Sequence, residues 1–174
     1  MIADRDTVRS LLRHLTEQDL PLRLSVVDAG GESAQPLHSM LTGDISWPYP
    51  PAATHGTLPT TIEDVAAALL PVDVPTDRLL AFLVNTCTRD LAYGVETGPV
   101  RTAEATTMLA RLIDLLGPEA RWRSNCDLSY VSQWSETGKP SPLSWNPLTH
   151  YTFDRAVIGT GGGITVTFLA VAED

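Results

Sequence analysis

The residue types that could support catalysis gather in the last third of the sequence. Cys126, His150 and Asp154 supply a thiol, an imidazole and a carboxylate, the groups of a cysteine nucleophile activated by an oriented base. Such a thiol reacts as its thiolate, so its surroundings must lower its pKa. The spacing of these residues imposes no geometry, and a cysteine in a strand is more often a small core residue. A small hydrolase or transferase that uses Cys126 or His150 with Asp154 is therefore an alternative hypothesis.

Possible metal ligands lie in the first half of the chain, where His38 and His55 bracket a proline-rich segment that contains Asp44. Imidazole and carboxylate groups bind several divalent ions. However, the spacing of these three residues matches no metal-binding pattern, and the sequence has no C-x-x-C or H-E-x-x-H motif. It also has no Walker loop and no G-x-S-x-G nucleophile elbow. We therefore expect no metal site and no cofactor.

Tryptophans in proline-flanked segments are the most distinctive feature of the sequence. Tryptophan and tyrosine are preferred anchors of protein interfaces, and loops commonly present functional side chains. The alternative is that these rings fold back over the sheet and close the core. The candidate partner-binding residues are these rings and their charged neighbours: Asp44, Trp47, Tyr49, Trp134, Glu136 and Trp145.

The charge of the chain is strongly negative. Twelve lysines and arginines against 21 acidic residues give a net charge of −9, with no basic stripe. This charge argues against binding to nucleic acids or anionic membranes, which need basic contacts. It favours a basic protein partner, although it could also serve solubility alone. No apolar run reaches the length of a membrane helix, and two cysteines are too few for a disulfide framework, so we expect a cytoplasmic protein.

Hydrophobic periodicity predicts the elements that must position these side chains. Apolar residues at helical spacing predict helices, and a Thr60-Thr-Ile-Glu63 capping box predicts the start of one of them. Alternating or β-branched runs predict strands, two of them joined at Gly161-Gly-Gly163 as a hairpin. The predicted helices cover residues 4–17, 60–70, 76–93 and 102–116, and the predicted strands cover residues 22–27, 121–128, 153–160 and 164–172.

This order of elements predicts a single α+β domain over residues 1–174. Several helices pack on a small, mostly antiparallel sheet that ends in a C-terminal β-hairpin. Two long loops rich in proline and aromatic residues, at about 30–59 and about 129–151, have no predicted regular structure.

Small size, strong acidity and missing catalytic motifs together predict a cytosolic protein-binding module. Its most concrete form is an inhibitor or immunity-type protein that neutralises a toxin or enzyme through aromatic loops and an acidic surface. The alternatives are the small enzyme described above and a small-molecule carrier with an apolar pocket.

Overall fold

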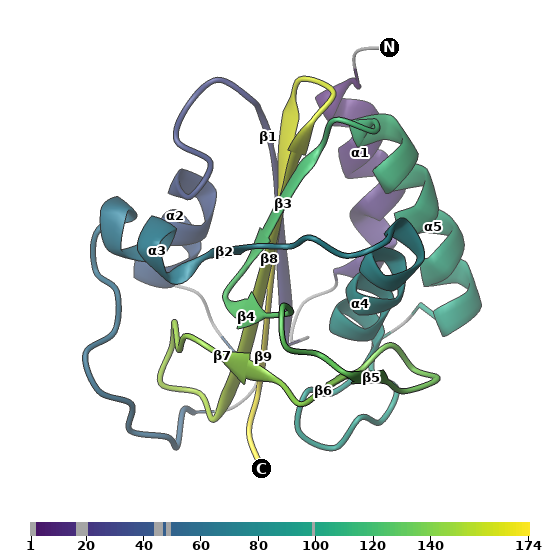
Figure 1. The fold of residues 1–174 in the computed structure, drawn as a ribbon. Coiled ribbons are helices and arrows are strands. Elements are labelled where there is room, and N and C mark those ends of the chain that lie inside the picture. Colours follow the sequence, from purple (N-terminus) through teal and green to yellow (C-terminus); the bar gives the residue numbers. More distant parts are fainter. Residues whose placement is uncertain (1–2, 17–20, 44–46, 48–49, 99) are drawn as a thin grey trace.

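The centre of the molecule is an antiparallel sheet between two layers of helices (Figure 1). The computed structural model describes residues 3–16, 21–43, 47, 50–98 and 100–174. The sheet order is β1-β9-β8-β3-β2, so the two longest strands are central and β1 and β2 form the edges. The strands are β1 (Leu22–Asp28), β2 (Leu70–Pro71), β3 (Arg121–Ser124), β8 (Phe153–Gly161) and β9 (Ile164–Ala172).

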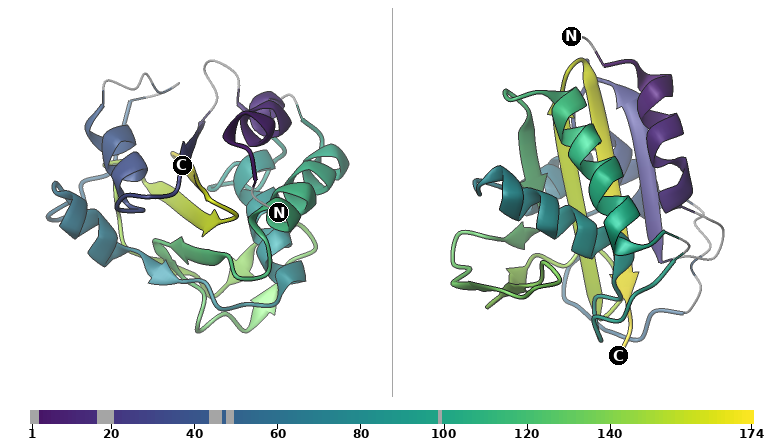
Figure 2. Two further views of the ribbon diagram at one scale, coloured as in Figure 1. Left: turned by 90° about the horizontal axis from the view of Figure 1, so that it is seen from above. Right: turned by 90° about the vertical axis from the view of Figure 1, so that its right-hand side faces the viewer.

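The helices divide between the two faces of this sheet, as the two views of Figure 2 also show. One face carries α1 (Arg5–Leu12), α4 (Thr76–Thr88) and α5 (Thr102–Leu116), with a short 3₁₀ turn, η1 (Arg13–Leu15), after α1. The other face carries the shorter α2 (Gln35–Thr42) and α3 (Ile62–Ala68). The predicted α+β class, with an antiparallel sheet and a C-terminal hairpin, is confirmed.

The β8–β9 hairpin forms at a turn whose glycines reach backbone conformations that other residues rarely adopt. Gly162 and Gly163 have φ angles of 59° and 86°, which are strained for any residue with a Cβ atom. A two-residue turn with positive φ at both positions matches the right-handed twist of the strands it joins. The central strand β9 consists only of apolar and threonine residues, and every one of them is buried.

A hydrophobic cluster lies on each face of the sheet. The larger one joins β1, β8 and β9 to α1, α4 and α5, with Phe82 and Phe168 fully buried. The smaller one joins the opposite face to α2 and α3 through Leu37, Val65 and Leu169. Because strand residues alternate between faces, each long strand contributes to both clusters.

The starts of α1 and α3 are fixed by local hydrogen bonds that the sequence encodes directly. The Asp4 carboxylate accepts the N–H of Thr7 at 3.0 Å and caps α1. Thr61 and Asp64 cap α3 reciprocally, because each side chain accepts the backbone N–H of the other.

Three predicted boundaries are wrong. The loop predicted over residues 30–59 contains α2, whose Pro36 sits in the first turn, where a missing N–H costs no helical hydrogen bond. The helix predicted over 76–93 ends at Thr88. The strand predicted over 121–128 is interrupted at Asn125.

The predicted loop over 129–151 also contains three short strands, which pair with one another or with residues just before the loop and are drawn in the lower half of Figure 1. Pairing of β4 with β7 and of β5 with β6 depends on contacts between distant residues, which local patterns do not reveal. These strands are β4 (Cys126–Asp127), β5 (Gln133–Trp134), β6 (Pro140–Ser141) and β7 (Ser144–Trp145).

Candidate functional site

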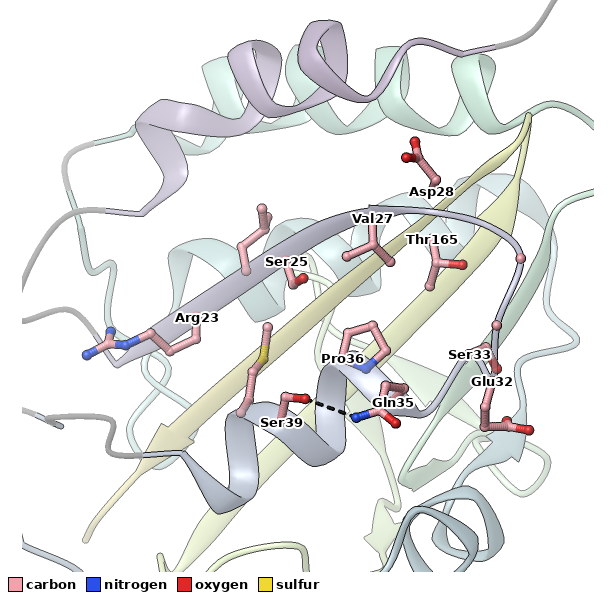
Figure 3. Close-up of a pocket in the computed structure, with 14 residues that line it drawn as sticks. Arg23, Ser25, Val27, Asp28, Glu32, Ser33, Gln35, Pro36, Ser39 and Thr165 are labelled. Carbon is pink, nitrogen blue, oxygen red and sulfur yellow. Dashed lines mark hydrogen bonds between the residues drawn. The ribbon is translucent and has the colours of Figure 1, made fainter.

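The candidate site is a groove of about 670 Å³ between the edge strand β1 and helix α2, which we call the edge groove (Figure 3). Ser25, Val27 and Thr165 line it from the sheet, and Pro36 and Ser39 line it from α2. Its volume lies in the range of ligand-binding clefts. Because β1 is the outermost strand, the groove follows an open edge of the sheet.

The backbone of β1 presents alternate residues to this open edge. Pro21 accepts a hydrogen bond from the N–H of Val171, and Ala29 donates one to Gly163, so odd-numbered residues of this strand bond to β9. The even-numbered residues therefore direct their N–H and C=O groups away from the sheet. These outward groups give the edge the hydrogen-bonding pattern that another strand could use.

Two arginines cover part of this edge, and the residue between them is left open. Arg9 donates to the carbonyl of Val26 at 3.0 Å, and Arg23 donates to that of Leu22 at 3.0 Å. The backbone N–H and C=O of Leu24, between those two, have no hydrogen-bond partner in the part of the chain that the structure describes. The centre of β1 is thus the most accessible point for backbone pairing.

The two ends of the edge groove carry opposite charges. Glu32 is exposed and has no ion-pair partner among the described residues. At the other end, the Arg23 guanidinium lies 4.7 Å from the centre of the Trp47 ring, a cation–π contact. The Trp47 ring in turn packs edge-on against Tyr151, with ring centres 5.8 Å apart. Of the described candidate residues, Trp47 is thereby linked to the groove.

The other predicted partner-binding residues lie elsewhere. Trp134 is half-buried and packs edge-on against Phe82, with ring centres 6.3 Å apart, whereas Glu136 is exposed. Trp145 is half-buried and packs against Phe153, with ring centres 5.7 Å apart. Asp44 and Tyr49 lie outside the described residues. The described tryptophans therefore do not form one surface. Trp47 adjoins the edge groove, whereas Trp134 and Trp145 pack against the larger hydrophobic cluster.

The structure places two residues of the predicted cysteine site, Cys126 and Asp154, on one cavity and leaves His150 outside it. Asp154 and Arg155 are consecutive in β8 and point to opposite faces of the sheet. Cys126 belongs to the larger hydrophobic cluster. It therefore lies on the same face of the sheet as the Arg155 side chain. His150 is exposed and does not line a described cavity with Cys126.

The Asp154 carboxylate has a structural role instead. Its Oδ2 accepts hydrogen bonds from the backbone N–H groups of Leu148 and Thr149 and from the Thr149 hydroxyl, at 2.8–3.0 Å. Its Oδ1 accepts one from Asn125 at 2.8 Å. Burial raises the pKa of Asp154, while the bonds from Leu148 and Thr149 oppose that change. The carboxylate fixes the chain before β8 and is not free to orient a histidine.

Both thiols should be unreactive in the folded protein. Burial raises the pKa of Cys87 to about 12, and burial also raises the pKa of Cys126 despite the nearby Arg155. We expect iodoacetamide at pH 8 to alkylate native Cys126 at least about a hundredfold more slowly than the guanidinium-unfolded chain, measured by mass spectrometry. Rapid labelling of native Cys126 would favour the cysteine-nucleophile hypothesis.

The two histidines that bracket the proline-rich segment make structural contacts. His38 Nε2 lies 2.9 Å from the Thr60 carbonyl oxygen, and His55 Nε2 lies 2.8 Å from that of Tyr151. Among the described residues, no three histidine, cysteine, aspartate or glutamate side chains group as metal ligands.

The edge groove was missed by sequence reasoning because its wall, α2, was predicted as loop. Leu37, Met40 and Leu41 recur at helical spacing after Pro36, a signal that the surrounding prolines and glycines obscured. That β1 forms an edge of the sheet depends on strand order, which the local pattern does not contain.

The arrangement defines an antiparallel α+β sandwich with an open edge groove. Comparisons of the chain with models of known protein families, with curated proteins and with solved structures gave no match. None of the described helices is long and apolar enough to cross a membrane.

Proposed function

We propose that this protein is a protein-binding module that holds an extended segment of a partner protein in the edge groove. The observation that carries the proposal is the position of the groove along the open edge of β1, where the Leu24 backbone has no partner among the described residues. Extended segments commonly bind proteins by adding a strand to such an edge.

The shape of the site favours a chain segment over a compact ligand. A strand that lies along the seven residues of β1 and pairs with it at Leu24 would extend over about 23 Å. Alternate side chains of that strand would enter the edge groove beside Val27 and Met40, while the others would face α1. Main-chain hydrogen bonds would then supply affinity, and the groove would select side chains.

Charge favours a basic partner. Glu32 offers a carboxylate for a lysine or arginine at one end of the groove, and the net charge of −9 would speed encounter with a basic surface. A protein that covers a basic enzyme in this way would act as an inhibitor, and an immunity-type protein against a toxin is the most concrete form. Partner contacts by Trp134, Glu136 and Trp145 remain a separate prediction.

Selection from a random peptide library displayed on phage tests the proposal without a known partner. We expect the wild-type protein to enrich peptides that alternate apolar residues and carry a lysine or arginine. Ser39→Trp fills the groove from α2, and we expect it to weaken the binding of the enriched peptides at least about tenfold, because it blocks their side chains.

The matched control is Thr107→Trp, which places the same side chain on an exposed position of α5 outside the groove. It should leave peptide binding unchanged. Equal binding by wild type and Ser39→Trp, or no enrichment of any peptide, would contradict the proposal. Self-association through β1, measured by sedimentation and abolished by Ser39→Trp, would also contradict it and indicate a second copy as the occupant.

A further inference from the structure

A second cavity, of about 280 Å³, lies among the segment after α4, strands β6 and β7, and the start of β8. We call it the Arg155 cavity. It is separate from the edge groove, since the two share no lining residue. Its walls are largely apolar, with Leu143, Trp145 and Phe153 among them. Its polar lining includes Cys126, Lys139, Asp154 and Arg155.

The most unusual residue of this cavity is a buried cation. Arg155 is only 3% exposed. Its Nη1 donates to Asn85 Oδ1 at 2.8 Å and to Thr86 Oγ1 at 3.2 Å, and its guanidinium lies 4.7 Å from the centre of the Phe82 ring. All of these partners are neutral. Among the described residues, the ion pairs involve Arg5 and Arg9, and none involves Arg155.

Burying a guanidinium without a counter-ion costs desolvation free energy, and buried charges in proteins are normally paired. Asp154, its neighbour in sequence, also lines the cavity but forms no ion pair with Arg155. Its carboxylate instead accepts hydrogen bonds from Leu148, Thr149 and Asn125. The Cys126 thiol contacts the guanidinium but remains neutral, since burial raises its pKa. The positive charge is therefore uncompensated within the described structure.

The guanidinium donates to oxygen acceptors through only one of its three nitrogens, among the described residues. Both hydrogen bonds to oxygen use Nη1, so the Nε–Nη2 edge has no oxygen acceptor among the described residues. This edge is the fork that binds a carboxylate through two parallel hydrogen bonds. Lys139, the only lysine of the chain, adds a second positive charge at the exposed side of the same cavity.

We propose that the Arg155 cavity binds a small organic carboxylate. The carboxylate group is held by Nε and Nη2 of Arg155, and the apolar part of the ligand packs against Leu143, Trp145 and Phe153. The volume is slightly below the range of drug-sized sites, which fits a ligand of about one ring. This assignment is independent of the partner bound in the edge groove.

Calorimetric titration of the purified protein with phenylacetate and with phenylacetamide tests the inference. The two probes have nearly the same shape and differ in charge. We expect phenylacetate to bind at least about tenfold more tightly, because only its carboxylate compensates Arg155. The variant Arg155→Gln should bring the ratio of the two affinities close to one. Lys139→Ala should change phenylacetate affinity less than about threefold, because exposed charges are screened.

Arg155→Gln could fail to fold, so a second variant is needed. Leu143→Trp enlarges a half-buried wall residue and leaves Arg155 in place. It should weaken phenylacetate binding at least about tenfold, whereas Ser39→Trp in the edge groove should not change it. Equal affinities of the wild type for the two probes, or no binding of either at about 10 mM, would overturn the proposal.

Discussion

Replacing Asn125 with alanine should lower the free energy of unfolding by about 3 kcal/mol. The Asn125 side chain is fully buried, and its Oδ1 accepts the backbone N–H of Ala156 at 2.7 Å. Its Nδ2 donates to Asp154 Oδ1 at 2.8 Å and to the Asn146 carbonyl at 3.0 Å. Alanine leaves the Ala156 N–H without its acceptor and removes one donor from a buried carboxylate, and each such loss costs about 1–3 kcal/mol.

Urea denaturation at 25 °C measures this loss, and the melting temperature should fall by about 10 °C. The matched control is Asn146→Ala, because Asn146 is exposed and its side chain donates one hydrogen bond, to the Ala68 carbonyl. Its cost should stay below about 1 kcal/mol. A similar loss for both variants would show that Asn125 is not the centre of the buried network.

Replacing Gly138 with alanine should detach the β5–β6 hairpin from α4 and lower the free energy of unfolding by about 3 kcal/mol. Gly138 has a φ angle of 80°, and a Cβ atom there would lie 2.2 Å from the Ala81 carbonyl oxygen in α4. The positive φ alone costs about 1 kcal/mol. The clash with helix backbone adds the loss of two docking contacts: the Asn85–Thr137 hydrogen bond of 2.8 Å and the packing of Trp134 on Phe82.

Gly117→Ala separates these two effects. Gly117 has nearly the same φ angle, 84°, but no atom lies within 4 Å of the Cβ position. Its substitution should cost about 1 kcal/mol through conformation alone. Hydrogen–deuterium exchange should increase in residues 133–141 of Gly138→Ala and remain unchanged there in Gly117→Ala. Equal free energies of unfolding for the two variants would mean that the β5–β6 hairpin shifts without any loss of stability.

The sequence by itself determined the elements whose causes are local. The glycines at 161–163 specified the hairpin, because two adjacent residues with positive φ are needed for its turn. The reciprocal cap of Thr61 and Asp64 specified the start of α3, and helical spacing of leucines specified α4 and α5. Each of these signals acts between residues only a few positions apart.

The candidate cysteine site shows where local reasoning ended. Cys126, His150 and Asp154 are suitable residue types, but β8 places Asp154 and Arg155 on opposite faces. The face that meets Cys126 depends on how β8 pairs with β3 and β9, and a shift of one residue would exchange the two side chains. Register therefore decided that the Arg155 guanidinium contacts the thiol.

Only the tertiary structure decided the two sites proposed for this protein. The edge groove exists because β1 is outermost and α2 packs beside it, and the Arg155 cavity exists because Asn85 meets Arg155 across 70 positions of sequence. Such contacts are stabilised by burial of surfaces from distant segments, which offsets the entropy lost in closing long loops. Composition and periodicity record which residues can be buried, whereas the pairing of distant segments determines which of them meet.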